Sequence, residues 1–499
     1  MKKINEIRIK FFDDRSGPYQ EIYDKLVEIN SDQNLLAMSC DYTNLNLVNF
    51  LLEQPKTLAT LNEPEVEFEG YSRYDYPIHV ACAANSLDIV KRLIEAGADL
   101  EARDLSGGTA LHSAAFSDKG PEVFLHLCTI DGININARNR VNMSLLSQAF
   151  TCPNDVVVIK KLLEMGVDAS NVDAYGKTAF HHACLHGSLE TFKLLLDHRC
   201  DVNVKDSKGN SPLHCISDKI FSNSYDDVTF EKLKILLKAP GLNKSVTNNS
   251  GETALHVACI NGTIQAISLL LNTDGIDKFA LDSNGENILH KSARRGDWKL
   301  YEKFVKEYKF DHEIKTKDGR GIIHLICEYD HREFFDDYIM EFFKKDNGNK
   351  VTAKPQRISR KKKNSKSKKT IDDSISNFNE MINSVDENGW TPLHYACDNG
   401  SFEIIEKLVE FAADFNKKDL QGKTPIDIAE SRGHLDDITD IAEQIDLKNS
   451  MDELGLNVVP DYLQGYDLSN HDGYYWSGKD GHDDDYYNDL ISSHKGSYY

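Results

Sequence analysis

The sequence lacks long apolar runs. No stretch of its 499 residues comes near the roughly 18 consecutive apolar residues that a membrane-spanning helix needs. The opening, MKKINEIRIKFFDDRSG, carries Asp13, Asp14 and Arg15 where a secretory signal peptide has its apolar stretch and cleavage site. We therefore expect a soluble protein that neither spans a membrane nor is secreted.

Positive charge is also scarce. The chain has 58 Lys and Arg against 80 Asp and Glu, which gives a formal net charge of -22. Such acidity argues against the protein as a whole binding nucleic acid or an anionic membrane. With 40% hydrophobic residues, the chain can still bury a core.

Motifs that carry chemistry are missing too. The sequence contains no Gly-rich phosphate loop, no Ser-His-Asp order, no zinc-ligand spacing and no kinase pattern. The stretch GWTPLHYACDNG, 389–400, does place His394 and Cys397 three residues apart, as a metal site or a nucleophile with its base would. The choice between that chemistry and a turn leading into a helix depends on the rest of the chain.

This stretch recurs along the chain. Copies include GGTALHSAA at 107, YGKTAFHHACLHGS at 175, GETALHVACINGT at 251 and NGENILHKSARRGD at 284. The apolar residue before the His marks the units at Leu36, Ile78, Leu111, Leu145, Phe180, Leu213, Leu255, Leu289, Ile323, Leu393 and Ile426. Most gaps are 33 to 35 residues, and the longer ones indicate insertions.

The residues and the period together resemble the ankyrin repeat family, with about eleven units over residues 34 to 447. The fullest matches are 173–203 and 386–416. The resemblance implies an all-α solenoid of stacked helix-turn-helix units joined by short β-hairpin-like loops. It also implies that partner proteins dock on the hairpin tips and on the concave face made by the first helices.

Each part of the unit has a physical reason. Glycines such as Gly251 lie in the hairpin, where a positive φ is easily adopted only by glycine. Pro77 and Pro392 fall in the first turn of a helix, where the missing N–H costs nothing. The second helix has apolar residues at helical spacing, as at Ile404, Ile405 and Leu408. One unit cannot cover that stripe, so the units must stack.

The recurring Cys and His residues follow from the same register. Cysteine occupies a small-residue position three places after the His, where it acts as a buried apolar side chain, and we expect these thiols to stay reduced and unpaired. The resemblance implies that each His joins its turn to the next unit by hydrogen bonds to the Thr hydroxyl or the backbone. Because the His residues lie one per unit, we expect no metal, no cofactor, no catalytic residue and no enzyme activity.

Function is therefore expected in the variable, exposed positions. Trp, Tyr and Arg are enriched at interface hot spots. We predict that a partner protein contacts Tyr175, Arg294, Arg295, Arg320, Tyr329, Trp390 and Asp398. The alternative, that these are ordinary surface residues, stays open.

Two segments depart from the repeat. Between Lys354 and Lys369 lie nine Lys or Arg and no acid, which indicates a solvated, disordered segment. It is either a solubilising insertion or a site for nuclear import, nucleic acid or anionic lipid, in which Arg360, Lys361, Lys362, Lys363, Lys366, Lys368 and Lys369 act. The tail from Met451 has ten acidic and two basic residues, so it could fold back and mask the basic segment.

The chain thus divides into five predicted parts. They are an N-terminal cap, a first block of repeats, a basic disordered insertion, the final repeats with a C-terminal cap, and an acidic Tyr/Gly/Asp-rich disordered tail, at 1–33, 34–348, 349–384, 385–450 and 451–499.

We expect a monomeric, non-enzymatic scaffold or adaptor in the cytoplasm, which holds an unidentified protein partner on its concave face. The alternative is a nuclear regulator associated with chromatin or nucleic acid. In that case nucleic acid would be bound only through the basic segment.

Overall fold

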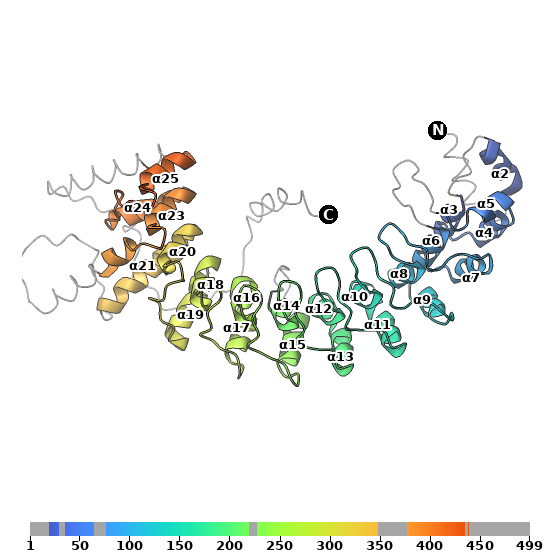
Figure 1. Ribbon diagram of the computed structural model, residues 1–499, viewed down its shortest axis with the longest axis horizontal. Helices are drawn as coiled ribbons and strands as arrows, with labels where there is room; N and C mark the ends of the chain where they lie inside the picture. The colour runs from blue at the N-terminus through green and yellow to red at the C-terminus, as the bar shows by residue number, and fades with distance from the viewer. Residues whose placement is uncertain are drawn as a thin grey trace, which may run out of the picture.

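The computed structural model is a curved array of stacked helix pairs, and it describes residues 19–28, 35–63, 76–152, 154–218, 227–347, 377–434 and 438. The first helix of each pair lies on the inside of the curve and the second on the outside (Figure 1). The predicted all-α solenoid is confirmed.

The first helices are short. They are α3 (Leu35–Asp41), α6 (Pro77–Ala83), α8 (Ala110–Ala115), α10 (Leu145–Ala149), α12 (Ala179–Leu185), α14 (Pro212–Asp218), α16 (Ala254–Asn261), α18 (Ile288–Arg295), α20 (Ile322–Glu328), α23 (Pro392–Asn399) and α25 (Pro425–Arg432). Successive first helices pack directly on one another from α3 to α8 and again from α10 to α25.

The second helices form the outer row. They are α4 (Leu45–Leu52), α7 (Leu87–Glu95), α9 (Glu122–Leu127), α11 (Asp155–Glu164), α13 (Leu189–Asp197), α15 (Asp227–Leu236), α17 (Ile264–Leu271), α19 (Trp298–Tyr308), α21 (Arg332–Asn347) and α24 (Phe402–Glu410). Two further helices, α2 (Tyr19–Glu28) and α5 (Pro55–Ala59), lie at the N-terminal end.

Local sequence sets the start of each first helix. In α16 the Thr253 hydroxyl accepts from the backbone N–H of His256, and the His256 ring accepts from the Thr253 N–H. This capping box satisfies two backbone donors that have no partner inside the helix. Pro77, Pro392 and Pro425 each stand at the first helical position, as predicted.

The histidines join neighbouring units, as the resemblance implies. His256 Nδ1 lies 2.8 Å from Thr253 Oγ1, and its Nε2 lies 3.1 Å from the carbonyl oxygen of Glu286 in the next unit. The same bond to a carbonyl of the following unit is made by His79, His181, His214, His324 and His394. These residues are therefore structural ties between repeats.

Apolar side chains form one continuous core along the array. On the second helices it buries stripes such as Ile404, Ile405 and Leu408. On the first helices it buries small residues, and Cys259 and Cys397 are fully enclosed. All ten cysteines are free, and burial raises the pKa of the Cys397 thiol to about 12, which keeps it protonated and inert.

The hairpins between units carry the β character that the sequence predicts. Isolated antiparallel bridges join Arg138 to Ser144, Val172 to Thr178 and Thr247 to Thr253. Gly251 adopts a φ of +74°, and a Cβ there would lie 2.6 Å from the backbone nitrogen of Ser283 in the next hairpin. Only glycine fits this position without strain.

One domain boundary is corrected. The predicted disordered insertion extended to residue 384, but residues 377–382 are helical, and Phe378 and Ile382 are buried in the core. The Phe378 and Phe411 rings meet edge to face at 5.1 Å between centroids. Apolar residues four apart, at helical spacing, explain why this end of the segment packs against α24.

Of the other predicted parts, the structure describes one helix of the N-terminal cap. Helix α2 packs Tyr23 against Phe50 of α4, with ring centroids 5.8 Å apart, which suits a cap over the first unit. The basic residues 354–369 and the tail 451–499 lie outside the described residues. Within the described ranges, every helix is too short or too polar to cross a bilayer.

Candidate functional site

Polar side chains that directly follow the His of a unit connect the first helices to the hairpins. In three units the residue after the His is polar and reaches the hairpin Asp nine residues earlier. The contacts are His182 Nε2 to Asp173 Oδ2 at 2.9 Å, Lys291 Nζ to Asp282 Oδ2 at 2.7 Å, and Tyr395 Oη to Asp386 Oδ2 at 2.7 Å. The other carboxylate oxygen of each Asp accepts backbone N–H groups of its own turn. The polar inner residues thus bind the hairpins to the helices.

Lys291 is the centre of a buried charge cluster. Its ammonium lies 2.9 Å from Glu252 Oε1, 2.7 Å from Asp282 Oδ2 and 2.9 Å from Glu286 Oε2. The Lys291 and Asp282 side chains are 3% and 1% exposed, and that of Glu286 is fully buried. Glu252 comes from the preceding unit, so the cluster also ties two repeats together.

Electrostatics in this cluster are set by Lys291. Burial alone would raise the pKa of Asp282, but the hydrogen bond and the charge of Lys291 hold it below its usual value. Burial would lower the pKa of Lys291, and the three carboxylates instead raise it. The pKa of Glu252 is lowered as well, so Lys291, Asp282 and Glu252 are charged near neutral pH.

Arg294 extends the cluster toward the surface. Its guanidinium lies 2.9 Å from the second Glu286 oxygen and 5.4 Å from the centre of the Tyr329 ring in the next unit. A second neighbour of Tyr329 is His331, whose ring is nearly parallel at 6.2 Å and whose Nε2 lies 2.7 Å from the Arg294 carbonyl oxygen. Tyr329 keeps 40% of its surface exposed. The predicted pair Arg294 and Tyr329 is therefore brought together, held rigidly and open to solvent.

Arg295 and Arg320 are engaged within the array. Arg295 donates to the Gly262 carbonyl at 2.6 Å. Arg320 is mostly buried, and its guanidinium lies 2.7 Å from Asp318 and 2.8 Å from Glu328. Their visible role is to hold neighbouring turns in place, and their predicted role in partner contact stays a prediction.

Trp390 forms a second aromatic group with Tyr395. The two rings meet edge to face at 4.9 Å, and the Trp390 indole N–H donates to Asp419 Oδ2 at 3.1 Å. Asp398, near the C-terminal end of α23, accepts from the Arg432 guanidinium at 2.6 and 3.1 Å. Trp390 is thus held between units with part of its surface exposed, while Asp398 is used in a bond between repeats.

Tyr175 lies apart from this group. It stands at a hairpin tip and is 61% exposed, five units before Trp390 along the array. The predicted localisation residues Arg360, Lys361, Lys362, Lys363, Lys366, Lys368 and Lys369 lie outside the described residues. The predicted site residues therefore form one cluster, over α18, α20 and α23, and separate outliers.

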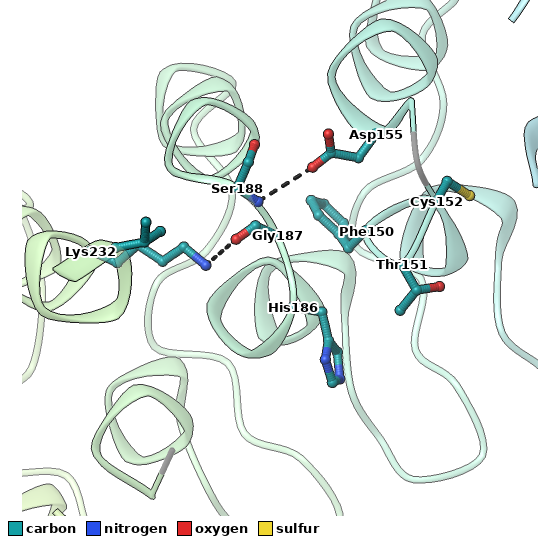
Figure 2. A pocket seen from close by; sticks show the side chains of 9 residues that line it. Phe150, Thr151, Cys152, Asp155, His186, Gly187, Ser188 and Lys232 are labelled. Carbon is teal, nitrogen blue, oxygen red and sulfur yellow. Dashed lines mark hydrogen bonds between the residues drawn. The ribbon is translucent and has the colours of Figure 1, made fainter. Parts of the chain in front are cut away.

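A pocket of about 560 Å³ opens at the junction of α11, α13 and α15. Figure 2 shows Lys232 reaching across it to Gly187, and Asp155 facing Ser188. The buried Lys232 ammonium donates to the carbonyls of Ala183, at 3.0 Å, and Gly187, at the C-terminal end of α12. A cation suits this end of a helix dipole, so Lys232 fastens α15 to α12. In the described part of the chain, no three His, Cys, Asp or Glu side chains are placed to hold a metal ion.

Comparison with known proteins agrees with this architecture. The family model that matches describes three consecutive ankyrin repeats. It matches residues 35–139, 146–230, 224–307 and 363–450. The chain is 31% identical over 169 residues to the B-cell lymphoma 3 protein homolog of Mus musculus, covering 33% of this chain and 37% of that protein. It is 26% identical over 232 residues to the nuclear factor NF-kappa-B p105 subunit of Gallus gallus, covering 44% and 22%.

A third similar protein is inversin of Canis lupus familiaris, 27% identical over 192 residues, which covers 38% of this chain and 17% of that protein. The chain therefore spans well under half the length of the curated relatives that it matches. The family model covers more than half of the chain, and among the helix pairs only α20 and α21 lie wholly between its matched ranges. The chain belongs to the ankyrin repeat family.

Proposed function

We propose that this protein is a non-enzymatic scaffold or adaptor that binds a partner protein on its inner face, over α18, α20 and α23. Ankyrin repeats are in general protein-binding modules, and this supports the class of function. The observation that carries the location is the exposed Tyr329 ring, which lies close to both Arg294 and His331. We name Arg294, Tyr329, Trp390 and Tyr395 the inner aromatic patch.

The inner aromatic patch has the physical properties of an interface hot spot. Its aromatic rings offer contact area at low entropic cost, because neighbouring side chains already fix them. The guanidinium of Arg294 is oriented by Glu286 and keeps part of its surface open. Tyr, Trp and Arg are the residues that most often dominate binding energy.

Alanine at Tyr329 tests the proposal. We expect Tyr329→Ala to weaken partner binding by about 2 kcal/mol, roughly thirtyfold in affinity, because it removes an aromatic anchor. The measurement is affinity purification with the full chain, followed by a titration of the recovered partner. Tyr329→Phe keeps the ring and should retain most of the affinity.

The control lies on the outer row. Lys299→Ala in α19 and Glu406→Ala in α24 change exposed residues of second helices and should leave recovery unchanged. Equal recovery by wild type, by Tyr329→Ala and by a Trp390→Ala variant that keeps the wild-type melting temperature would rule out this face.

The second candidate is a nuclear regulator. It is favoured by the nine basic residues between Lys354 and Lys369 and by the similarity to the nuclear factor NF-kappa-B p105 subunit. We expect replacement of Lys361, Lys362 and Lys363 by Ala to abolish nuclear enrichment, because import signals depend on clustered positive charge. Fluorescence microscopy of the tagged full chain measures this, and an even distribution of the wild type would remove the candidate.

A further inference from the structure

Four consecutive hairpins, at 103–108, 138–143, 172–177 and 205–210, present a positively charged edge. Their cations are Arg103, Arg138, Arg140, Lys177, Lys205 and Lys208, and we name this set the basic hairpin edge. Within the described residues, none of the six lies within ion-pair distance of a carboxylate. Unneutralised cations are unexpected in a chain of net charge -22.

The acids in these hairpins do not offset the charge at the surface. Asp173 and Asp206 are buried, and each accepts two backbone N–H groups of its own turn. Asp173 also faces His182. Asp104 is only partly exposed and accepts from Ser106 and Gly108.

The basic hairpin edge is continuous from unit to unit. The Arg103 guanidinium donates to the carbonyl of Arg138 at 2.7 Å, and Lys205 donates to the carbonyl of Thr247 at 2.6 Å. Arg138 reaches the carbonyl of Val172 in the same way, at 3.5 Å. Three of the six cations, Arg103, Arg138 and Lys205, are therefore anchored on the next hairpin without an ion-pair partner there.

Apolar side chains interleave with these cations. Leu105, Val141, Val172 and Tyr175 belong to the same hairpins and are 45%, 42%, 41% and 61% exposed. A ligand that matches this edge needs negative charge together with aromatic or aliphatic groups. Charge alone would leave the apolar residues uncovered.

We propose that residues 466–490 of this chain dock on the basic hairpin edge. This segment, YDLSNHDGYYWSGKDGHDDDYYNDL, contains seven Asp, one Lys, five Tyr and one Trp. It supplies both the negative charge and the aromatic groups that a ligand of this edge needs. The other candidate binding site for this acidic segment is the basic stretch 354–369. It contains only one large apolar residue, Ile358, and therefore matches the aromatic residues of the segment less well than the edge does.

The connecting chain is long enough. From the last described residue, Ile438, to residue 466 the chain can span at most about 92 Å when extended. The hairpin at 205–210 lies five units before the last one, which amounts to about 40–50 Å at the usual helix spacing. The edge is separate from the inner aromatic patch, so this inference does not rest on the proposed function.

Carbodiimide crosslinking of the purified full chain tests the proposal, because the reagent joins carboxylates to lysines only when they touch. We expect crosslinks from Asp483, Asp484, Asp485 or Asp489 to Lys177, Lys205 or Lys208. Their yield should fall at least fivefold between 50 mM and 500 mM salt, since screening weakens exposed ion pairs. An equal mixture of isotope-labelled and unlabelled chains shows whether the linked residues belong to one molecule.

A charge-reversal pair supplies the matched comparison. Arg140→Glu with Lys208→Glu changes two exposed residues of the edge, and Lys160→Glu with Lys193→Glu changes two exposed residues of α11 and α13. The edge variant no longer has Lys208, so its crosslinks are counted at Lys177 and Lys205, where we expect at least a fivefold reduction. The α11 and α13 variant should leave the crosslinks at these two lysines unchanged. Crosslinks mainly to Lys361–Lys369, crosslinks mainly between labelled and unlabelled chains, equal effects of the two pairs, or no crosslinks would each overturn the proposal.

Discussion

Replacement of Lys291 by Met lowers the free energy of unfolding of the repeats around α18 by about 3–5 kcal/mol, because removing one partner of a buried ion pair leaves charge uncompensated. Methionine matches the length of the lysine stem, so packing changes little. Asp282 and Glu252 lose their cation, while Glu286 keeps Arg294. Hydrogen–deuterium exchange of peptides from α16 to α20 measures the local loss.

The size of this effect depends on charge. Tyr395→Phe removes an equivalent but uncharged donor to Asp386, and should cost only about 1 kcal/mol. The deficit of Lys291→Met should shrink as the pH falls, because the carboxylates then take up protons. A loss below 1 kcal/mol, or a loss that is independent of pH, contradicts the charged cluster.

Acidification from pH 7 to pH 5 destabilises the whole array. Burial lowers the pKa of His112, His290 and His324 to about 4. Burial is also the largest cause of the lowered pKa of His181, His182, His214, His256 and His394.

The direction follows from proton uptake. The unfolded chain binds protons at the ordinary histidine pKa of about 6.5, whereas the folded array resists protonation down to its lower pKa. The stability that the neutral, buried histidines contribute is therefore fully present above pH 6.5, and it is lost as the pH falls below this value. Each of the three histidines with a pKa near 4 costs about 2 kcal/mol by pH 5.

A histidine variant isolates this effect. His324→Gln should reduce the difference in unfolding free energy between pH 7 and pH 5 by about 2 kcal/mol, whatever it does to stability at pH 7. Urea denaturation at each pH, followed by circular dichroism, measures it. Equal stability of the wild type at pH 7 and pH 5 contradicts the buried, neutral state of these rings.

The repeat pattern predicted most of the fold. The period, Pro392 at a helix start and the bonds of His394 all follow from side chains that act within one unit or between adjacent units. The helical end of the insertion was missed, although Phe378 and Ile382 have the spacing of a buried face. Its position beside a long basic stretch concealed that signal.

The candidate site was less predictable. Residue type singled out Arg294, Arg320 and Asp398 alike, but only the folded structure shows that each is bonded within the array, to Glu286, to Glu328 and to Arg432 respectively. The contact of Lys291 with Asp282 was also missed, since it requires the hairpin to fold over the helix. A usable signal exists in the sequence: Lys291 occupies a position where other units have Val257 or Leu325.

Hydrogen–deuterium exchange of the full chain, with and without the purified partner, tests the binding of a protein on the inner face most directly. We expect protection of peptides from α18, α20 and α23, which carry or border the inner aromatic patch, with α17, α19 and α24 unchanged. Protection confined to those second helices, or no protection anywhere in the array, would contradict this assignment.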